Sequence, residues 1–196
     1  SLKTAGEMQE EAEFGTSILA FFVLSLFAIY ALLAIAFRSY SQPLLILTAV
    51  PFGFFGAILG HLLMGYNISI MSMLGFLAAA GVVVNDNLVL MDRINQLRAG
   101  GMAVMDAVVQ AGRDRFRPII LTSITTFIGL VPIMFERSIQ AQFLIPMVVS
   151  LAFGVLCATF VTLILVPNLY KVIEVLRVKI KGDKASAEEF VSFEKA

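Results

Sequence analysis

Apolar residues dominate the chain in five long runs, separated by short polar or charged connections. The runs predict membrane spans at about 15–38, 43–64, 68–97, 117–136 and 140–170. A helix needs about 20 mostly apolar residues to cross a bilayer, and each run reaches that length once its flanks are counted. The pattern therefore predicts an all-α membrane protein in which five transmembrane helices form a bundle over residues 14–170.

The segment between the third and fourth runs is not uniformly apolar but has apolar and polar residues at helical spacing. Over residues 102–113 the apolar side chains fall on one side of a helix and the polar ones on the other, with Met102, Met105, Val108 and Val109 opposite Asp106, Gln110 and Arg113. An amphipathic helix of this kind is typical of a segment lying in a membrane surface. The segment is predicted to be a surface helix on the cytoplasmic side.

The basic residues indicate which way the spans run. Of the 14 Lys and Arg residues, twelve lie in the connections and ends on one side, and only Lys3 and Arg137 lie on the other. Connections rich in Lys and Arg stay in the cytoplasm. We expect the N-terminus outside and the C-terminus inside, with residues 1–13 the remnant of an external loop and 171–196 a partly disordered cytoplasmic tail.

Composition excludes several classes of protein. The chain is 59% hydrophobic with a mean hydropathy of +0.92, and its 14 acidic residues balance the 14 basic ones. This profile is unlike that of a soluble enzyme or a nucleic-acid binder. One cysteine, Cys157, rules out an intrachain disulfide, and no catalytic residue, metal site or cofactor is expected. The start lacks Met and a signal peptide, so the chain reads as part of something longer.

Asp86 interrupts the third run, in "GVVVNDNLVLMDR". At 100° per residue it shares a helix face with Ala79 and Gly75, whereas Asn85 lies on an adjoining stripe with Gly81. A stripe of small residues favours contact with another helix, so the carboxyl group is predicted to point into the bundle. Burial favours its neutral form, which would let it load and release a proton. Alternatively, it only bonds a neighbouring helix or reaches toward the cytoplasm.

The fourth run offers a partner surface for Asp86. One side of it is polar or small, with Thr122, Ser123, Thr125, Thr126 and Gly129 at helical spacing. The hydroxyl of Thr122 can relay a proton or hold a water molecule. It can equally bond the carbonyl oxygen four residues back in its own helix.

Three motifs resemble the C-terminal membrane half of the resistance-nodulation-division (RND) efflux transporters. They are "FRSYSQPLLIL", which corresponds to the link between the family's eighth and ninth helices, the polar pair in "GVVVNDN" of the tenth, and "RPIILTS", which opens the eleventh. The resemblance covers residues 14–170. It implies that the spans are helices eight to twelve of a twelve-helix protein and that residues 1–13 end its second large periplasmic loop.

The resemblance also implies a function. RND transporters couple inward proton flow to export, as trimers in the inner membrane of Gram-negative bacteria. Their relay joins an acidic pair on the fourth helix, a polar or basic position on the tenth and a Thr on the eleventh. By motif, these last two fall on Asn85 with Asp86 and on Thr122. The well-known drug pumps have Lys-Asn where "ND" stands here, so the positive partner is missing.

The expected partners are the lipid bilayer, the N-terminal half of the same transporter with its acidic pair, a periplasmic adaptor and an outer-membrane channel. Supporting roles in the relay or in helix packing fall on Asn87, Thr126, Gly75, Ala79 and Gly81. The chain is not expected to transport alone, and the sequence leaves its cargo open. The alternative is a membrane scaffold or lipid-sensing helical module that transports nothing and in which Asp86 is dispensable.

Overall fold

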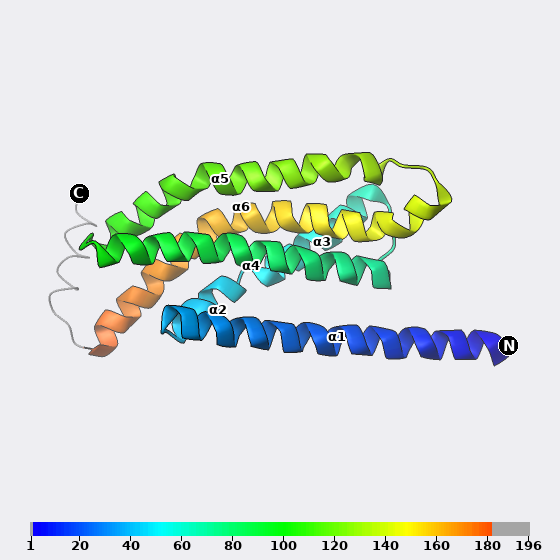
Figure 1. Ribbon diagram of the computed structural model, residues 1–196, viewed down its shortest axis with the longest axis horizontal. Helices are drawn as coiled ribbons and strands as arrows, with labels where there is room; N and C mark the ends of the chain where they lie inside the picture. Colours follow the sequence, from blue (N-terminus) through cyan, green and yellow to red (C-terminus); the bar gives the residue numbers. More distant parts are fainter. Residues whose placement is uncertain (1, 182–196) are drawn as a thin grey trace.

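The computed structural model describes residues 2–181, which form six helices joined by short connections (Figure 1). In chain order they are α1 (Leu2–Phe37), α2 (Ser41–Leu47), α3 (Val50–Met64), α4 (Ile70–Ala99), α5 (Val104–Met134) and α6 (Ile139–Lys181). Within the described residues, five segments are long and apolar enough to cross a membrane, with α2 and α3 counted as one. The prediction of an all-α bundle with five spans is confirmed.

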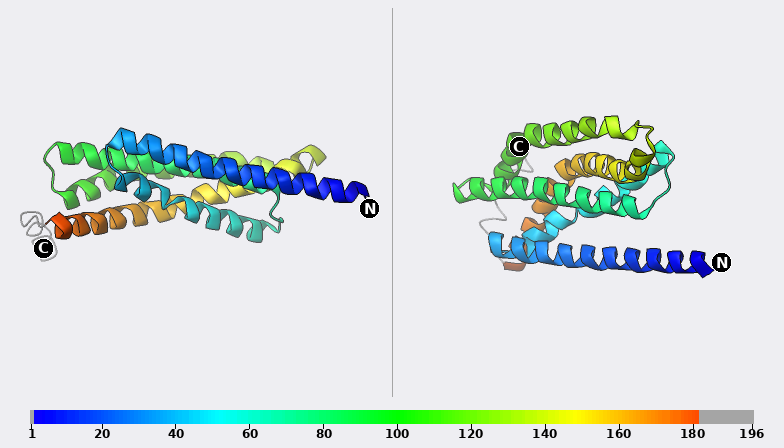
Figure 2. Two further views of the ribbon diagram at one scale, coloured as in Figure 1. Left: turned by 90° about the horizontal axis from the view of Figure 1, so that it is seen from below. Right: turned by 45° about the vertical axis from the view of Figure 1, so that its right-hand side comes forward.

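The helix α6 lies at the centre of the bundle, in contact with α3, α4 and α5. Figure 1 shows its first half between α4 and α5, whereas α1 lies along one side of the molecule. α1 begins at one end of the bundle and the last described turn of α6 lies at the other (Figure 2). Many large apolar side chains of α1 are exposed, among them Phe21, Phe27 and Ile35. A helix with so open an apolar surface is suited to contact with lipid or further protein.

Glycines bring α4 and α6 close enough for backbone contact. A Cβ atom built on Gly75 of α4 would overlap the carbonyl oxygen of Met147 in α6. Ala79 lies one turn after Gly75 on α4, and a Cβ on Gly154 of α6 would lie 3.1 Å from its Cβ. Small residues at such positions allow two membrane helices to pack by van der Waals contact without a hydrophobic driving force.

The contacts continue in regular steps, which fixes the register of the two parallel helices. Val83 of α4 clusters with Ala158 of α6. About two turns further along each helix, Leu90 belongs to the same core cluster as Val166. The residues between these two pairs, Asp86 and Asn87 on α4 and Thr162 on α6, therefore occupy one layer of the contact.

The predicted span 43–64 is interrupted. α2 ends at Leu47 and α3 begins at Val50. Pro51, in the first turn of α3, has no amide hydrogen to donate to the carbonyl oxygen of Leu47, so the helical bonding pattern breaks there. The hydroxyl of Thr48 donates to the carbonyl oxygen of Leu45 at 2.6 Å and the amide of Ala49 donates to that of Ile46 at 3.4 Å.

The prediction of a separate surface helix at 102–113 is wrong, because this segment and the fourth span form one continuous helix, α5. Val104, Ala107, Val108 and Ala111 are buried against the rest of the protein. Part of the apolar side of the segment thus packs on neighbouring helices, whereas Met102 and Val109 stay exposed. Pro118 lies inside α5 without ending it.

The two ends of the chain, predicted to be a loop remnant and a tail, are helical where the structure describes them. Residues 2–13 continue α1, and they are rich in Ala, Glu, Gln and Met, which favour helix. At the other end α6 continues to Lys181, so residues 171–181 of the predicted tail are helical. The rest of that tail, 182–196, lies outside the described residues.

Candidate functional site

Asp86 lies on the inner face of α4, where its side chain is 8% exposed. Ala79 and Gly75, on the same face, are buried as well. The sequence predicts this orientation, because a stripe of small residues lets another helix approach, and α6 fills that role. No ion pair reaches Asp86 within the described residues.

Asn87 is fully buried beside Asp86 and reaches the interrupted helix. Its Nδ2 donates to the carbonyl oxygen of Ile46, at 3.3 Å. A carbonyl oxygen can only accept, so this bond fixes which end of the amide is nitrogen. Asn87 Oδ1 then points elsewhere and has no partner among the described residues, and neither has Asp86 Oδ2.

Thr162 adds a third buried oxygen from α6. It is 1% exposed, and its Oγ1 has no hydrogen-bond partner in the described part of the chain. The register of α4 and α6 places it in the layer of Asp86 and Asn87. Sequence reasoning missed this residue. The available signal was a pair of threonines, Thr159 and Thr162, three positions apart in an apolar span.

Thr159, one turn before Thr162, is paired. Its hydroxyl lies 2.6 Å from that of Ser123 in α5, and Ser123 Oγ also contacts the carbonyl oxygen of Ile119 at 3.1 Å. Since Ser123 donates its hydrogen to Ile119, Thr159 can donate to Ser123. The pair ties α5 to α6 and leaves no hydroxyl hydrogen unused.

The other two predicted relay residues lie on the outside of the described bundle. Asn85 is exposed on α4, and a Cβ on neighbouring Gly81 would meet nothing within 4 Å. Thr122 is exposed on α5 and its hydroxyl donates to the carbonyl oxygen of Pro118, at 2.9 Å. Thr126 is half-buried. The chain alone therefore separates Asn85 and Thr122 from Asp86, which faces inward.

Polar contacts hold α4 in place at both ends. Near its C-terminal end, Arg93 pairs with Asp114 of α5 at 2.6 Å, and Asn95 exchanges two amide hydrogen bonds with Gln42 of α2, at 2.9 and 3.0 Å. At its start, Nε2 of the buried His61 on α3 lies 2.7 Å from the hydroxyl of Ser72. These contacts set the rotation of α4, and with it the direction of Asp86.

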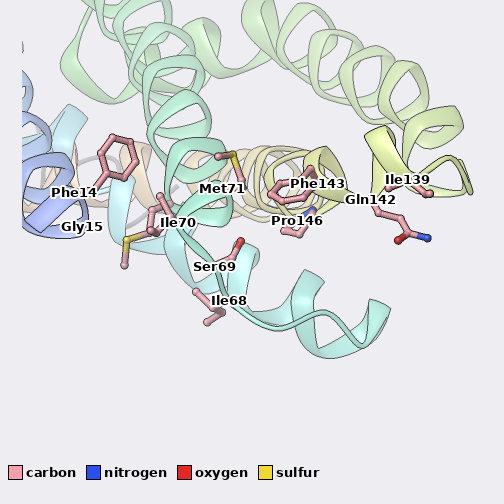
Figure 3. Close-up of a pocket in the computed structure, with 11 residues that line it drawn as sticks. Phe14, Gly15, Ile68, Ser69, Ile70, Met71, Ile139, Gln142, Phe143 and Pro146 are labelled. Atoms are coloured by element: carbon pink, nitrogen blue, oxygen red, sulfur yellow. The ribbon is translucent and has the colours of Figure 1, made fainter. Parts of the chain in front are cut away.

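A groove opens at the His61 end of the bundle, between the starts of α4 and α6 and residues 14–15 of α1 (Figure 3). It has a volume of about 840 Å³. Figure 3 shows Ser69 and Gln142 among neighbours such as Phe14, Met71 and Phe143. The groove has no acid or base, so it offers no group that binds a proton. No cluster of three or more metal-binding side chains is present among the described residues.

The fold and the buried carboxyl group define a multi-pass membrane protein with a polar layer inside an apolar bundle. The model of the AcrB/AcrD/AcrF family matches residues 1–174, and the chain belongs to this family of RND efflux transporters. This confirms the resemblance seen in the sequence motifs. This family consists of transporters and not of enzymes.

Individual relatives and solved structures are consistent with this family. The chain is 31% identical over 183 residues to the swarming motility protein SwrC of Bacillus subtilis (strain 168), covering 93% of this chain and 17% of that protein. Two crystal forms of a heavy metal efflux pump have the same fold, with TM-scores of 0.75 and 0.65 and identities of 27% and 28%. The alignments cover 85% and 78% of this chain but only 16% and 15% of the pump. The chain thus spans a small part of the relatives it matches.

Proposed function

We propose that the complete protein is an efflux transporter driven by the proton-motive force, that this chain supplies half of its membrane domain, and that Asp86 takes up and releases the proton. One observation carries the proposal. Asp86 is a carboxylic acid inside an apolar helix contact, buried, without an ion pair among the described residues, and with Oδ2 unpartnered. Ionisable groups within membrane spans are costly, and they commonly mark ion pathways.

Protonation gives such a group two states with different bonding. The charged carboxylate can only accept hydrogen bonds, whereas the neutral acid can also donate one. Taking up a proton removes a buried charge and supplies a donor at the contact between α4 and α6. The two states therefore favour different packing of these helices, which is how a proton can bias a conformational equilibrium.

In this proposal the membrane potential supplies the energy for transport. A proton moving inward gains about 2.3 kcal/mol per 100 mV of membrane potential. Export follows when helix movements reach the parts of the protein that hold the cargo. Those parts lie outside this chain, and the heavy metals named for the related pump are not assigned to it.

The open side of α4 and α5 supplies a surface for the other half of the membrane domain. Ala78, Gly81 and Asn85 of α4 are exposed, as is Thr122 of α5, and small side chains let another helix come close. We place the fourth helix of the N-terminal half here, with its acidic pair toward Asn85 and Thr122. Because Asn85 stands where the drug pumps have Lys, Asp86 carries the proton without that cation.

The remaining proposals follow the family. The complete protein is placed in a bacterial inner membrane, with the start of this chain in the periplasm and its end in the cytoplasm, as the distribution of basic residues predicts. It is proposed to form a trimer that works with a periplasmic adaptor and an outer-membrane channel. The trimer can be checked by crosslinking in native membranes.

Proton flux in vesicles tests the proposal. The full-length protein is placed in liposomes with a potassium diffusion potential, and an internal pH-sensitive dye reports proton entry. Asp86→Asn should abolish the flux and Thr122→Ala should slow it. Asp92→Asn is the matched control, since Asp92 is six residues further along α4 and accepts a bond from Gln96 at the surface. Equal fluxes in wild type and Asp86→Asn would support the alternative, a scaffold or lipid-sensing module.

A further inference from the structure

By the register of α4 and α6, three oxygen atoms without partners fall in one layer of the bundle. They are Oδ2 of Asp86, Oδ1 of Asn87 and Oγ1 of Thr162, and the only other buried side-chain atom of this kind in the described residues is Nε of Arg115. The three side chains are 8%, 0% and 1% exposed. Unpaired polar atoms are costly in an apolar interior, so three in one layer call for a common explanation.

The register of α4 and α6 brings the three atoms to the same level. Val83 packs with Ala158 on one side of the layer, and Leu90 shares a cluster with Val166 on the other. Thr162 is four residues from both Ala158 and Val166, and Asn87 is four residues from Val83. Residues three or four apart lie on the same face of a helix, so these side chains project into the same contact.

Counting hydrogens shows what the layer lacks. One amide hydrogen of Asn87 is donated to the carbonyl oxygen of Ile46, and Nδ2 makes no hydrogen bond to Asp86 Oδ2. Asn87 therefore offers the layer its Oδ1, which can only accept. The hydroxyl of Thr162 supplies one hydrogen. With Asp86 charged, that single hydrogen has to serve both the carboxylate and the Asn87 oxygen. With Asp86 protonated, two hydrogens serve two acceptors, and no charge is buried.

We propose that Asp86, Asn87 and Thr162 form a proton-binding site in which the acid of Asp86 donates to Asn87 Oδ1 when the proton is bound, and Thr162 donates to the Asp86 carboxylate when it is released. The inference rests on the proposed function, because the proton is the one that drives transport. It adds two positioning residues to Asp86. Through Thr162 it also makes α6, the helix that contacts α3, α4 and α5, the element that responds to the proton.

Asp86 has no charged partner among the other titratable side chains that the structure describes on the neighbouring helices. On α4 itself Asp92 and Arg93 are nearly two turns further along, and Arg93 pairs with Asp114 of α5. On α3, His61 is bonded to Ser72 near the start of α4. The remaining titratable or charged side chains that the structure describes on α4, α5 and α6 form no ion pair with Asp86; they are Arg98 on α4, Asp106, Arg113, Arg115 and Arg117 on α5, and Cys157 and Tyr170 on α6. Asp86 thus depends on hydrogen bonds more than on a neighbouring charge.

The two positioning residues should act in opposite directions. Thr162→Val removes the donor that stabilises the charged carboxylate, so protonation should persist to higher pH. Asn87→Leu removes the acceptor that only the protonated acid satisfies, so protonation should be lost at lower pH. A hydrogen bond of ordinary strength corresponds to a shift of about 0.5 to 1 pH unit in each case.

The experiment follows the pH dependence of proton flux by the full-length protein in liposomes, with the infrared carboxyl band of Asp86 as a second readout. The band is assigned by its absence in Asp86→Asn. We expect the midpoints of both readouts to rise in Thr162→Val, to fall in Asn87→Leu and to return to the wild-type value in Thr162→Ser. Thr159→Val is the matched control, because the hydroxyl of Thr159 is already paired with Ser123. It should leave the midpoints unchanged.

The outcomes separate the two proposals. If Asp86→Asn abolishes the flux but Thr162→Val and Asn87→Leu keep the wild-type midpoints, the three-residue site is wrong and the proposed function stands. If Asp86→Asn leaves the flux unchanged, the proposed function is wrong, and the infrared midpoints alone decide whether the site exists. Equal shifts in Thr159→Val and Thr162→Val would also overturn the site, because they would indicate a general loosening of α6. Where Thr162→Val does not fold, Thr162→Ala against Thr162→Ser gives the same comparison.

Discussion

The two faces of α4 carry similar residues and serve different purposes. The inner face, with Gly75, Ala79 and Asp86, is closed by α6. The outer face, with Ala78, Gly81 and Asn85, is exposed and has room beside its glycine. Small residues permit a close helix contact but do not create one. The difference shows that the polar triplet Asn85-Asp86-Asn87 is divided between two environments, and only Asp86 and Asn87 enter the closed one.

Replacing one glycine on each face of α4 tests whether only the inner face is closely packed. Gly75→Ala places a methyl group against the backbone of Met147 and should lower the free energy of unfolding of the full-length protein in detergent by about 3 kcal/mol, near the upper end for overpacking. Gly81→Ala should change it by less than about 0.5 kcal/mol. Thermal unfolding of both variants checks this. Equal losses would mean that the outer face is packed as tightly as the inner one.

We expect Asp86 to lower the stability of the protein and to be required for proton flux. Asp86→Leu replaces an acid with an apolar side chain inside the bundle, and we expect a gain of about 2 kcal/mol in stability together with loss of proton flux. Parallel unfolding and flux measurements on one preparation separate the two effects. A variant that lost stability would show that the carboxyl group has a strong partner in the complete protein.

The two asparagines on either side of Asp86 make a matched pair. Asn87→Ala removes the donor to the Ile46 carbonyl oxygen at the helix break and should cost about 1 to 1.5 kcal/mol. Asn85→Ala, on the open face, should cost clearly less. Hydrogen exchange at residues 46–50 provides the local readout, since faster exchange is expected there in Asn87→Ala alone. Similar exchange in both variants would contradict the assigned role of Asn87.

The smallest effects are expected at the hydroxyls of α5. Ser123→Ala removes the cross-helix bond to Thr159 and should cost about 0.6 kcal/mol, the usual value for such a bond within a membrane. Thr122→Val removes only a bond to its own helix and should be neutral. Unfolding midpoints of the two variants in the same detergent distinguish them. A larger loss at Thr122 would indicate that this side chain has a partner beyond the chain described here.

Several features of the fold can be predicted from the sequence because they depend on local chemistry. A long apolar run must be helical to satisfy its backbone in lipid, so the five spans follow from their length. The 100° period of the helix then places Asp86 on the stripe of Gly75 and Ala79. The motifs around Asn85 and Thr122 indicated the family in the same way, since they require only the order of residues.

Other features depended on which helices meet. Pro51 accounts for a break in the helix at Thr48 and Ala49, but the break matters because Asn87 reaches the carbonyl oxygen of Ile46 there. The amphipathic segment 102–113 suited a membrane surface equally well, but it is part of the continuous helix α5, in which Val104, Ala107, Val108 and Ala111 are covered by protein. A hydrophobic stripe has the same pattern whether lipid or another helix covers it.

The sequence by itself determined that a carboxylic acid sits in a membrane span beside small residues and which face of the helix it occupies. Only the tertiary structure decided that this face is the closed one, that Asn85 and Thr122 lie outside it, and that Thr162 joins it. The physical reason is that periodicity acts within one helix, whereas the register of α4 against α6 arises from contacts between residues some 75 positions apart, such as Val83 with Ala158.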